Sequence, residues 1–126
     1  MSLIVKVSLE EKDDPLDKIE KVLKVNPEAK VLLVRVNGGL VRLKKVLEVL
    51  VQVQTHSPHL DFWLSLGNND LERLSEEVCE LMSQLNLVYL DLAFNKLKSL
   101  PASFSKLNKL TQSHSIEKET KTKEDC

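Results

Sequence analysis

The segment Leu87–Leu110 constrains the fold of this chain most, because its leucines and one asparagine recur at fixed spacing. It opens with the order L-x-x-L-x-L-x-x-N-x-L. Residues two apart lie on the same side of a β-strand, so Leu90 and Leu92 are predicted to point into a core. Asn95 follows where the chain leaves that strand, and a buried amide there can bind main-chain groups that no regular ladder reaches. The segment therefore predicts a short strand followed by a turn with an internal asparagine.

The same order recurs three times upstream, with growing departures from it. Asn69 holds the asparagine position in the second copy, whereas Gly39 and Glu10 take that position in the two earlier copies. The central apolar residues of the four copies, in chain order, are Val5, Val34, Leu64 and Leu90, which are 29, 30 and 26 residues apart. Periods of this length leave room for a full helix after each strand.

Helical spacing in the intervening segments supports this interpretation. The first helix is predicted to begin at Asp14-Pro15, a capping residue followed by proline at the first helical position. The second carries an apolar stripe over residues 40–51, and the third is capped by Ser75 with two glutamates in its first turn. The last return, Pro101–Lys109, is predicted to be only one or two turns.

The spacing of these leucines and asparagines resembles the leucine-rich repeat, in its short cytoplasmic type. The resemblance covers Phe62–Leu110 closely and Val31–Leu50 loosely. It implies an α/β fold, a right-handed α/β solenoid of about four strand-helix coils with a parallel sheet. It also implies a role in binding another protein, and it names no partner.

The pattern stops after Leu110, so we expect a repeat solenoid over residues 1–111 and a disordered charged tail over residues 112–126. A solenoid that ends without a polar cap suggests a truncated or partial member of a longer family. Self-association through the last coil is then possible. The apolar residues expected to lie partly open there are Leu97, Leu100, Phe104, Leu107 and Leu110.

Composition excludes several classes of partner. A net charge of −1 over 126 residues gives no global field that would attract nucleic acid or an anionic membrane. The apolar opening is too short for a signal peptide, and no run approaches the ~20 residues of a membrane span, so we expect a cytoplasmic protein. The two cysteines are expected to be free thiols, with Cys79 as a small buried apolar side chain.

Motifs for catalysis are absent from the sequence, so we expect a protein that is not an enzyme and needs no cofactor. Gly38-Gly39 lies between a predicted strand and a predicted helix, as in a phosphate-binding turn, but lacks a third glycine and a Lys-Ser/Thr pair. The other interpretation is that the glycines only allow a sharp turn. His56 and His59 lie three apart near Asp61, but in a proline-containing loop we expect a solvated pair and no metal.

Alternation along the predicted strands places a second set of side chains on the face opposite the core. We expect a partner-binding site there because the set contains the only Trp and the only Tyr of the chain, beside charged residues. The rival interpretation is that edge packing or the tail covers this face. Three rows are predicted: Ile4, Leu33, Trp63 and Tyr89; Lys6, Arg35, Ser65 and Asp91; and Ser8, Asn37, Gly67 and Ala93. The residues assigned to partner binding are Leu33, Arg35, Trp63, Ser65, Tyr89 and Asp91.

Two rival functions stay open on the sequence. One is a small open α/β domain of flavodoxin-like or regulatory type that binds a phosphorylated ligand at Gly38-Gly39. The other is a fragment or designed sequence with no selected function. The preferred function is a non-enzymatic module that binds another protein on the concave face of its sheet.

Overall fold

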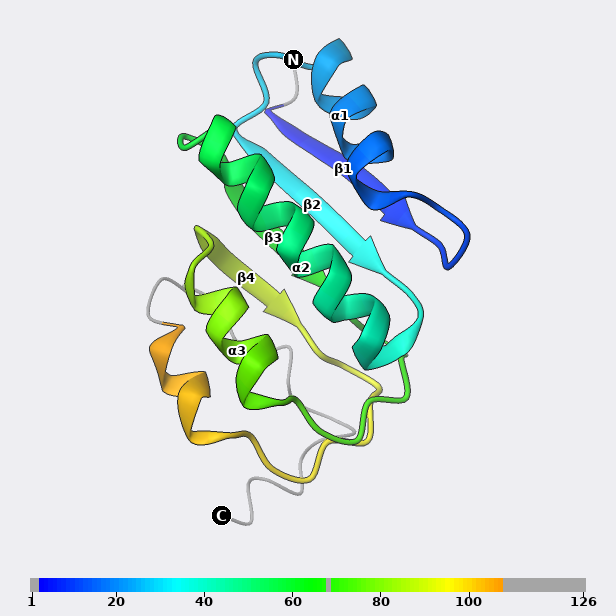
Figure 1. The fold of residues 1–126 in the computed structure, drawn as a ribbon, viewed down its shortest axis with the longest axis vertical. Coiled ribbons are helices and arrows are strands. Elements are labelled where there is room, and N and C mark those ends of the chain that lie inside the picture. Colours follow the sequence, from blue (N-terminus) through cyan, green and yellow to red (C-terminus); the bar gives the residue numbers. More distant parts are fainter. Residues whose placement is uncertain (1–2, 68, 108–126) are drawn as a thin grey trace.

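A computed structural model describes residues 3–67 and 69–107. Strands and helices alternate along these residues, as the sequence predicts (Figure 1). None of the helices in these two ranges combines the length and the apolar character needed to cross a membrane. The elements are β1 (Ile4–Leu9), α1 (Pro15–Val25), β2 (Val31–Val36), α2 (Gly39–His56), β3 (Asp61–Ser65), α3 (Glu76–Ser83), β4 (Leu87–Asp91) and the 3-10 helix η1 (Ala102–Lys106).

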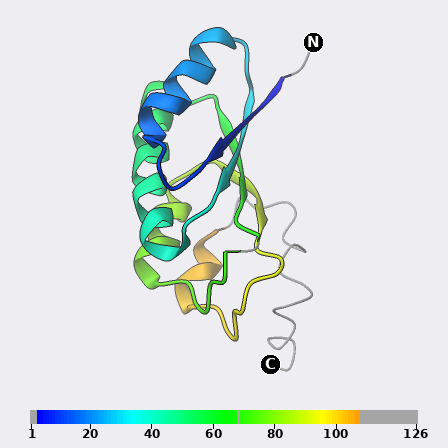
Figure 2. The same cartoon turned by 90° about the vertical axis from the view of Figure 1, so that its right-hand side faces the viewer.

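The four strands form one parallel sheet in the order β1-β2-β3-β4, with β1 and β4 at its edges. Helices α1, α2 and α3 lie side by side on one face of this sheet (Figures 1 and 2). The structure therefore confirms the predicted α/β class and the parallel sheet. The opposite face carries none of these three helices, and we call it the open face.

The core lies between the sheet and the helix layer, and leucine and valine supply most of it. Leu90 and Leu92 are buried as predicted, and Cys79 of α3 is fully buried. The predicted helix starts are also correct, because α1 begins at Pro15 and the Ser75 hydroxyl accepts a hydrogen bond from the Val78 N–H at 3.1 Å. The Ser75 cap and Pro15 at the first helical position thus mark these helix starts, although the Asp14 side chain makes no capping hydrogen bond. The apolar stripes hold the helices against the sheet.

The predicted register of β1 is wrong by two residues. Val7, not Val5, pairs with Val34, so Ile4 lies opposite Val31 and Lys6 lies opposite Leu33. A shift of two residues keeps the same side chains on the same face, so the hydrophobic pattern cannot distinguish the two registers. The predicted pairings between β2, β3 and β4 agree with the structure along the rows of Trp63 and Ser65.

Asn69 and Asn95 occupy equivalent positions in the turns after β3 and β4, and we call them the asparagine ladder. The Asn95 amide donates to the carbonyl oxygens of Leu92 (3.0 Å) and Leu66 (2.8 Å). Its oxygen accepts from the N–H groups of Asn69 and Leu71, each at 2.9 Å. Asn95 is only 1% exposed, so it satisfies backbone groups that water cannot reach.

Asn69 repeats this arrangement toward the preceding coil. Its amide donates to the carbonyl oxygens of Leu66 (2.9 Å) and Val36 (2.7 Å), and its oxygen accepts from the Gly38 N–H at 3.1 Å. Asn69 is half-buried, whereas Asn95 is buried. The ladder therefore joins the turns that follow β2, β3 and β4.

The last described coil is more closed than the sequence suggests. Residue Leu97 is buried, and Leu107 is 8% exposed at the end of η1, which packs against α3. Leu100 and Phe104 are half-buried, and Leu110 lies outside the described residues, as does the predicted tail. Self-association through this coil stays a prediction, with fewer open side chains to drive it.

Replacing Asn95 by Ala should lower the free energy of unfolding by about 3 kcal/mol, because buried carbonyl and N–H groups lose their partners. Asn69→Ala should cost less, about 1 kcal/mol, because water can reach a half-buried site. Urea denaturation of both variants measures the difference. An Asn69→Ala loss equal to or larger than that of Asn95→Ala would contradict the burial described for the ladder.

Candidate functional site

The open face presents the alternate side chains of each strand. Because inward residues such as Leu32, Leu64 and Leu90 fill the core, their neighbours face away from the helices. Parallel pairing then aligns them in rows across the sheet. Ile4, Val31 and Asp61 form a row over three strands. The two rows that cross all four strands are Lys6, Leu33, Trp63 and Tyr89, and Ser8, Arg35, Ser65 and Asp91.

An aromatic pair lies at the centre of this face. The ring centroids of Trp63 and Tyr89 are 5.5 Å apart, and the ring planes are tilted by 50°. Leu33 lies beside Trp63 on the neighbouring strand, and all three side chains are half-buried. Tilted contact is a favourable geometry for two aromatic rings, so each ring holds the other in place.

A shallow hollow of about 370 Å³ opens between the two rows. The structure brings the six residues predicted for partner binding together around this hollow. Lys6 also lines it, although the sequence placed Lys6 in the row of Arg35 and not in the row of Leu33. The complete lining is Lys6, Leu33, Arg35, Trp63, Ser65, Tyr89 and Asp91.

Asp91 also has a structural role at the end of β4. Its Oδ1 accepts a hydrogen bond from the Ala93 N–H at 3.0 Å, which fixes the turn that leads to the asparagine ladder. Gly67 lies in the neighbouring turn, where an added Cβ would approach the Ala93 carbonyl oxygen to 3.2 Å. Asp91 is therefore less available to a partner than its place in the row suggests.

The glycine pair lies at a different corner, between β2 and α2. Gly38 and Gly39 have φ values of +128° and +84°, a region that L side chains rarely adopt. The Gly38 N–H is already engaged by Asn69, and Glu10 and Glu11 line the hollow beside it. Lys12 lines the same hollow, so its single positive charge is outnumbered by two carboxylates, and the net negative charge opposes a phosphate group. The geometry therefore favours the interpretation that the glycines serve the turn.

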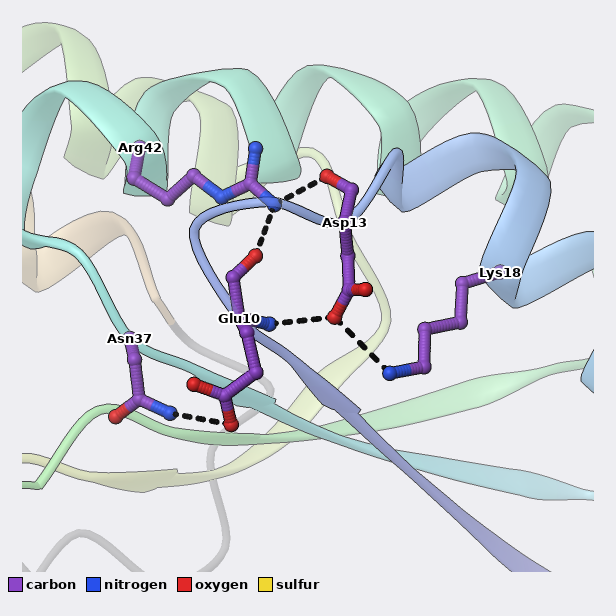
Figure 3. Close-up of polar contacts among 5 residues, drawn as sticks. All are labelled: Glu10, Asp13, Lys18, Asn37 and Arg42. Carbon is purple, nitrogen blue, oxygen red and sulfur yellow. Dashed lines mark hydrogen bonds and ion pairs between the residues drawn. The ribbon is translucent and has the colours of Figure 1, made fainter.

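Arg42 of α2 pins the loop that follows β1 at this corner (Figure 3). Its guanidinium donates to the carbonyl oxygens of Glu10 (2.6 Å) and Asp13 (2.5 Å). These bonds engage the Arg42 guanidinium with main-chain groups. Sequence reasoning missed this role of Arg42, because no local pattern relates it to a loop 29 and 32 residues earlier.

Asp13 closes the same loop through its carboxylate (Figure 3). Its Oδ2 accepts from the Glu10 N–H at 2.7 Å and from the Lys18 ammonium at 3.0 Å. The hydrogen bond from Glu10 and then that from Lys18 lower the pKa of Asp13 below its usual 3.8. The Asn37 amide donates a longer hydrogen bond, 3.5 Å, to the Glu10 carboxylate in the same corner (Figure 3).

His56, His59 and Cys79 do not form a reactive cluster. His56 Nδ1 lies 3.1 Å from the Gln52 carbonyl oxygen within α2. Within residues 3–67 and 69–107, no three His, Cys, Asp or Glu side chains gather in a way that could hold a metal ion. Burial raises the pKa of the Cys79 thiol, so this cysteine is a poor nucleophile in the folded chain.

The Asp13 contacts predict a stability difference that depends on pH. Because folding lowers the pKa of Asp13, its carboxylate stabilises the fold above the unfolded pKa, and this contribution is lost as pH falls through the folded pKa. Asp13→Asn should therefore melt at lower temperature than wild type above about pH 5, and the gap should narrow below about pH 4.

Asp14→Asn is the matched control, because it makes the same charge change one residue away at a side chain without a capping hydrogen bond. Thermal melts followed by circular dichroism at several pH values provide the comparison. A difference in melting temperature between Asp13→Asn and wild type that stays constant down to the lowest pH would contradict the hydrogen bonds described for the Asp13 carboxylate.

Comparisons of the chain with protein-family models, with curated proteins and with solved structures found no match.

Proposed function

We propose that this chain is a non-enzymatic module of the leucine-rich-repeat type that binds another protein on the open face of its sheet. The order of the strands supports the repeat assignment, because each strand pairs with the next one along the chain. The inward residues Val7, Val34, Leu64 and Leu90 align across the sheet at intervals of 27, 30 and 26 residues. The asparagine ladder supplies the internal amides that such repeats require.

The observation that carries the binding function is the aromatic pair in the hollow of the open face. Trp63 and Tyr89 touch each other and remain half-buried, beside Leu33 and outside the main core. Large aromatic side chains of this kind concentrate binding energy when a partner covers them. Apolar surface bordered by charged residues is also typical of protein interfaces.

The position of this pair on strands favours a preformed site. Trp63 lies on β3 and Tyr89 on β4, and each strand leads into a turn held by Asn69 or Asn95. Parallel pairing of the two strands fixes the backbones of both aromatic residues. A partner would therefore meet side chains that need little rearrangement, which reduces the entropy lost on binding. Rigid elements hold an interface in register better than loops do.

The test compares wild type with Trp63→Ala and with Val41→Ala as matched control. Val41 is 87% exposed on α2, in the helix layer on the opposite side of the sheet. Partners captured from cell extract by wild type are identified, and the dissociation constant of each is then measured with purified protein. Trp63→Ala should weaken a true complex by about 2 kcal/mol or more, and Val41→Ala should leave it unchanged.

Stability measured on the same variants separates a binding role from a core role. Loss of the ring contact should lower the free energy of unfolding of Trp63→Ala by about 1 kcal/mol. The proposal is overturned if Trp63→Ala unfolds at the assay temperature, or if its dissociation constant for the partner equals that of wild type.

A further inference from the structure

We propose that the segment bound by the open face is an acidic peptide segment of the partner protein. Its carboxylate pairs with Arg35 and Lys6, and an adjacent apolar side chain packs on Trp63 and Tyr89. This inference rests on the proposed protein-binding function and names the chemistry of the partner.

The first support is that neither cation is paired with another of the residues that the structure describes. The ion pairs of the described residues use other cations, namely Lys18, Lys21, Lys44, Lys96 and Lys106. Neither the Arg35 guanidinium nor the Lys6 ammonium has a hydrogen bond or ion pair with any residue in 3–67 and 69–107. Arg35 is half-buried, and none of its nitrogens is among the polar atoms of the described residues that are sealed from water without a partner, so its charge stays open to a bound group.

The second support is the surroundings of Arg35 on the sheet. Its neighbours across the strands are Ser8 and Ser65, which carry no charge. The nearest acidic residue in its row is Asp91, two strands away at about 10 Å, since parallel strands are about 4.8 Å apart. Asp91 also binds the Ala93 N–H, so it is not the counter-ion of Arg35.

The third support is the distribution of charge around the hollow. Cations lie on β1 and β2 at Lys6 and Arg35, whereas Asp91 lies on β4, two residues after Tyr89. The other acidic residue on this face of the strands is Asp61, two residues before Trp63 at the start of β3. A carboxylate placed over the cations is therefore attracted by both and is kept from the Asp91 side by like charge. This arrangement orients a bound segment across the strands.

The chemistry of the two groups favours a peptide over other anions. A guanidinium matches a carboxylate through two parallel hydrogen bonds, which gives direction as well as attraction. The aromatic pair next to it requires an apolar side chain within a few residues, which a peptide supplies. Two cations on a chain of net charge −1 are too few for a nucleic acid backbone or a membrane surface.

The test uses Trp63 as its own reporter, because it is the only tryptophan of the chain. Three capped synthetic peptides of the repeating sequences Glu-Phe-Glu-Leu, Gln-Phe-Gln-Leu and Lys-Phe-Lys-Leu are titrated while Trp63 emission is recorded. The acidic peptide should bind about tenfold more tightly than the neutral one, and the basic peptide most weakly. Added salt should weaken the acidic complex, because the paired charges are partly exposed.

Variants of the cations assign the effect to residues. Arg35→Glu and, independently, Lys6→Glu should each weaken the acidic peptide about tenfold or more, and Arg35→Lys should weaken it less. Lys45→Glu is the matched control, because it makes the same charge change at an exposed position of α2 and should leave binding unchanged. Circular dichroism melts verify that each variant is folded.

Several outcomes would overturn the inference. Equal binding of the acidic and neutral peptides, an unchanged affinity in both Arg35→Glu and Lys6→Glu, or no binding of any peptide would each do so. Displacement of the acidic peptide by inorganic phosphate alone would show a simple anion site. Trp63 emission that changes with protein concentration would make a second copy the occupant. The protein-binding function is judged separately, by the comparison of Trp63→Ala with Val41→Ala.

Discussion

The buried amide of Asn95 is the interaction on which the rest of this structure depends. Its donors and acceptor satisfy main-chain groups of its own turn and of the turn after β3, where sheet pairing has ended. Asn69 carries the same connection back to the turn after β2. An unpaired buried carbonyl or N–H group is costly. The two amides supply partners for these groups, so the strands can stop at their carboxyl ends while keeping a fixed register. That register places Trp63 beside Tyr89 and Ser65 beside Asp91.

The loop after β1 is held by different contacts. It has no asparagine in the equivalent position, and the loop after β1 instead receives the guanidinium of Arg42 from the next coil. Asp13 completes that loop through a backbone N–H and Lys18. The corner therefore holds an internal network of polar groups, and the glycines beside it supply backbone freedom to the turn. The Gly38-Gly39 pair suggested a phosphate site, but the backbone conformation of the turn between β2 and α2 accounts for both glycines.

The two faces of the sheet differ because the helices all return on one side. The helix side uses most of the leucine and valine of the chain and is closed. The open face carries an aromatic pair and one leucine. It also carries Lys6 and Arg35, whose charged groups have no partner among the described residues. The helix side of the sheet is a filled apolar core, whereas the open face carries an apolar patch beside two cations. This difference supports a binding function. The two cations indicate that the bound segment is acidic.

The sequence by itself determined the elements of this protein, because capping residues and apolar periodicity act locally. Ser75 and Pro15 start helices where predicted, and alternation about Leu64 and Leu90 correctly separated core residues from face residues. Only the tertiary structure decided the register of β1, since a shift of two residues leaves every side chain on the same face. It alone also decided the bonds of Arg42 and the burial of Leu97, because both depend on residues distant in the chain.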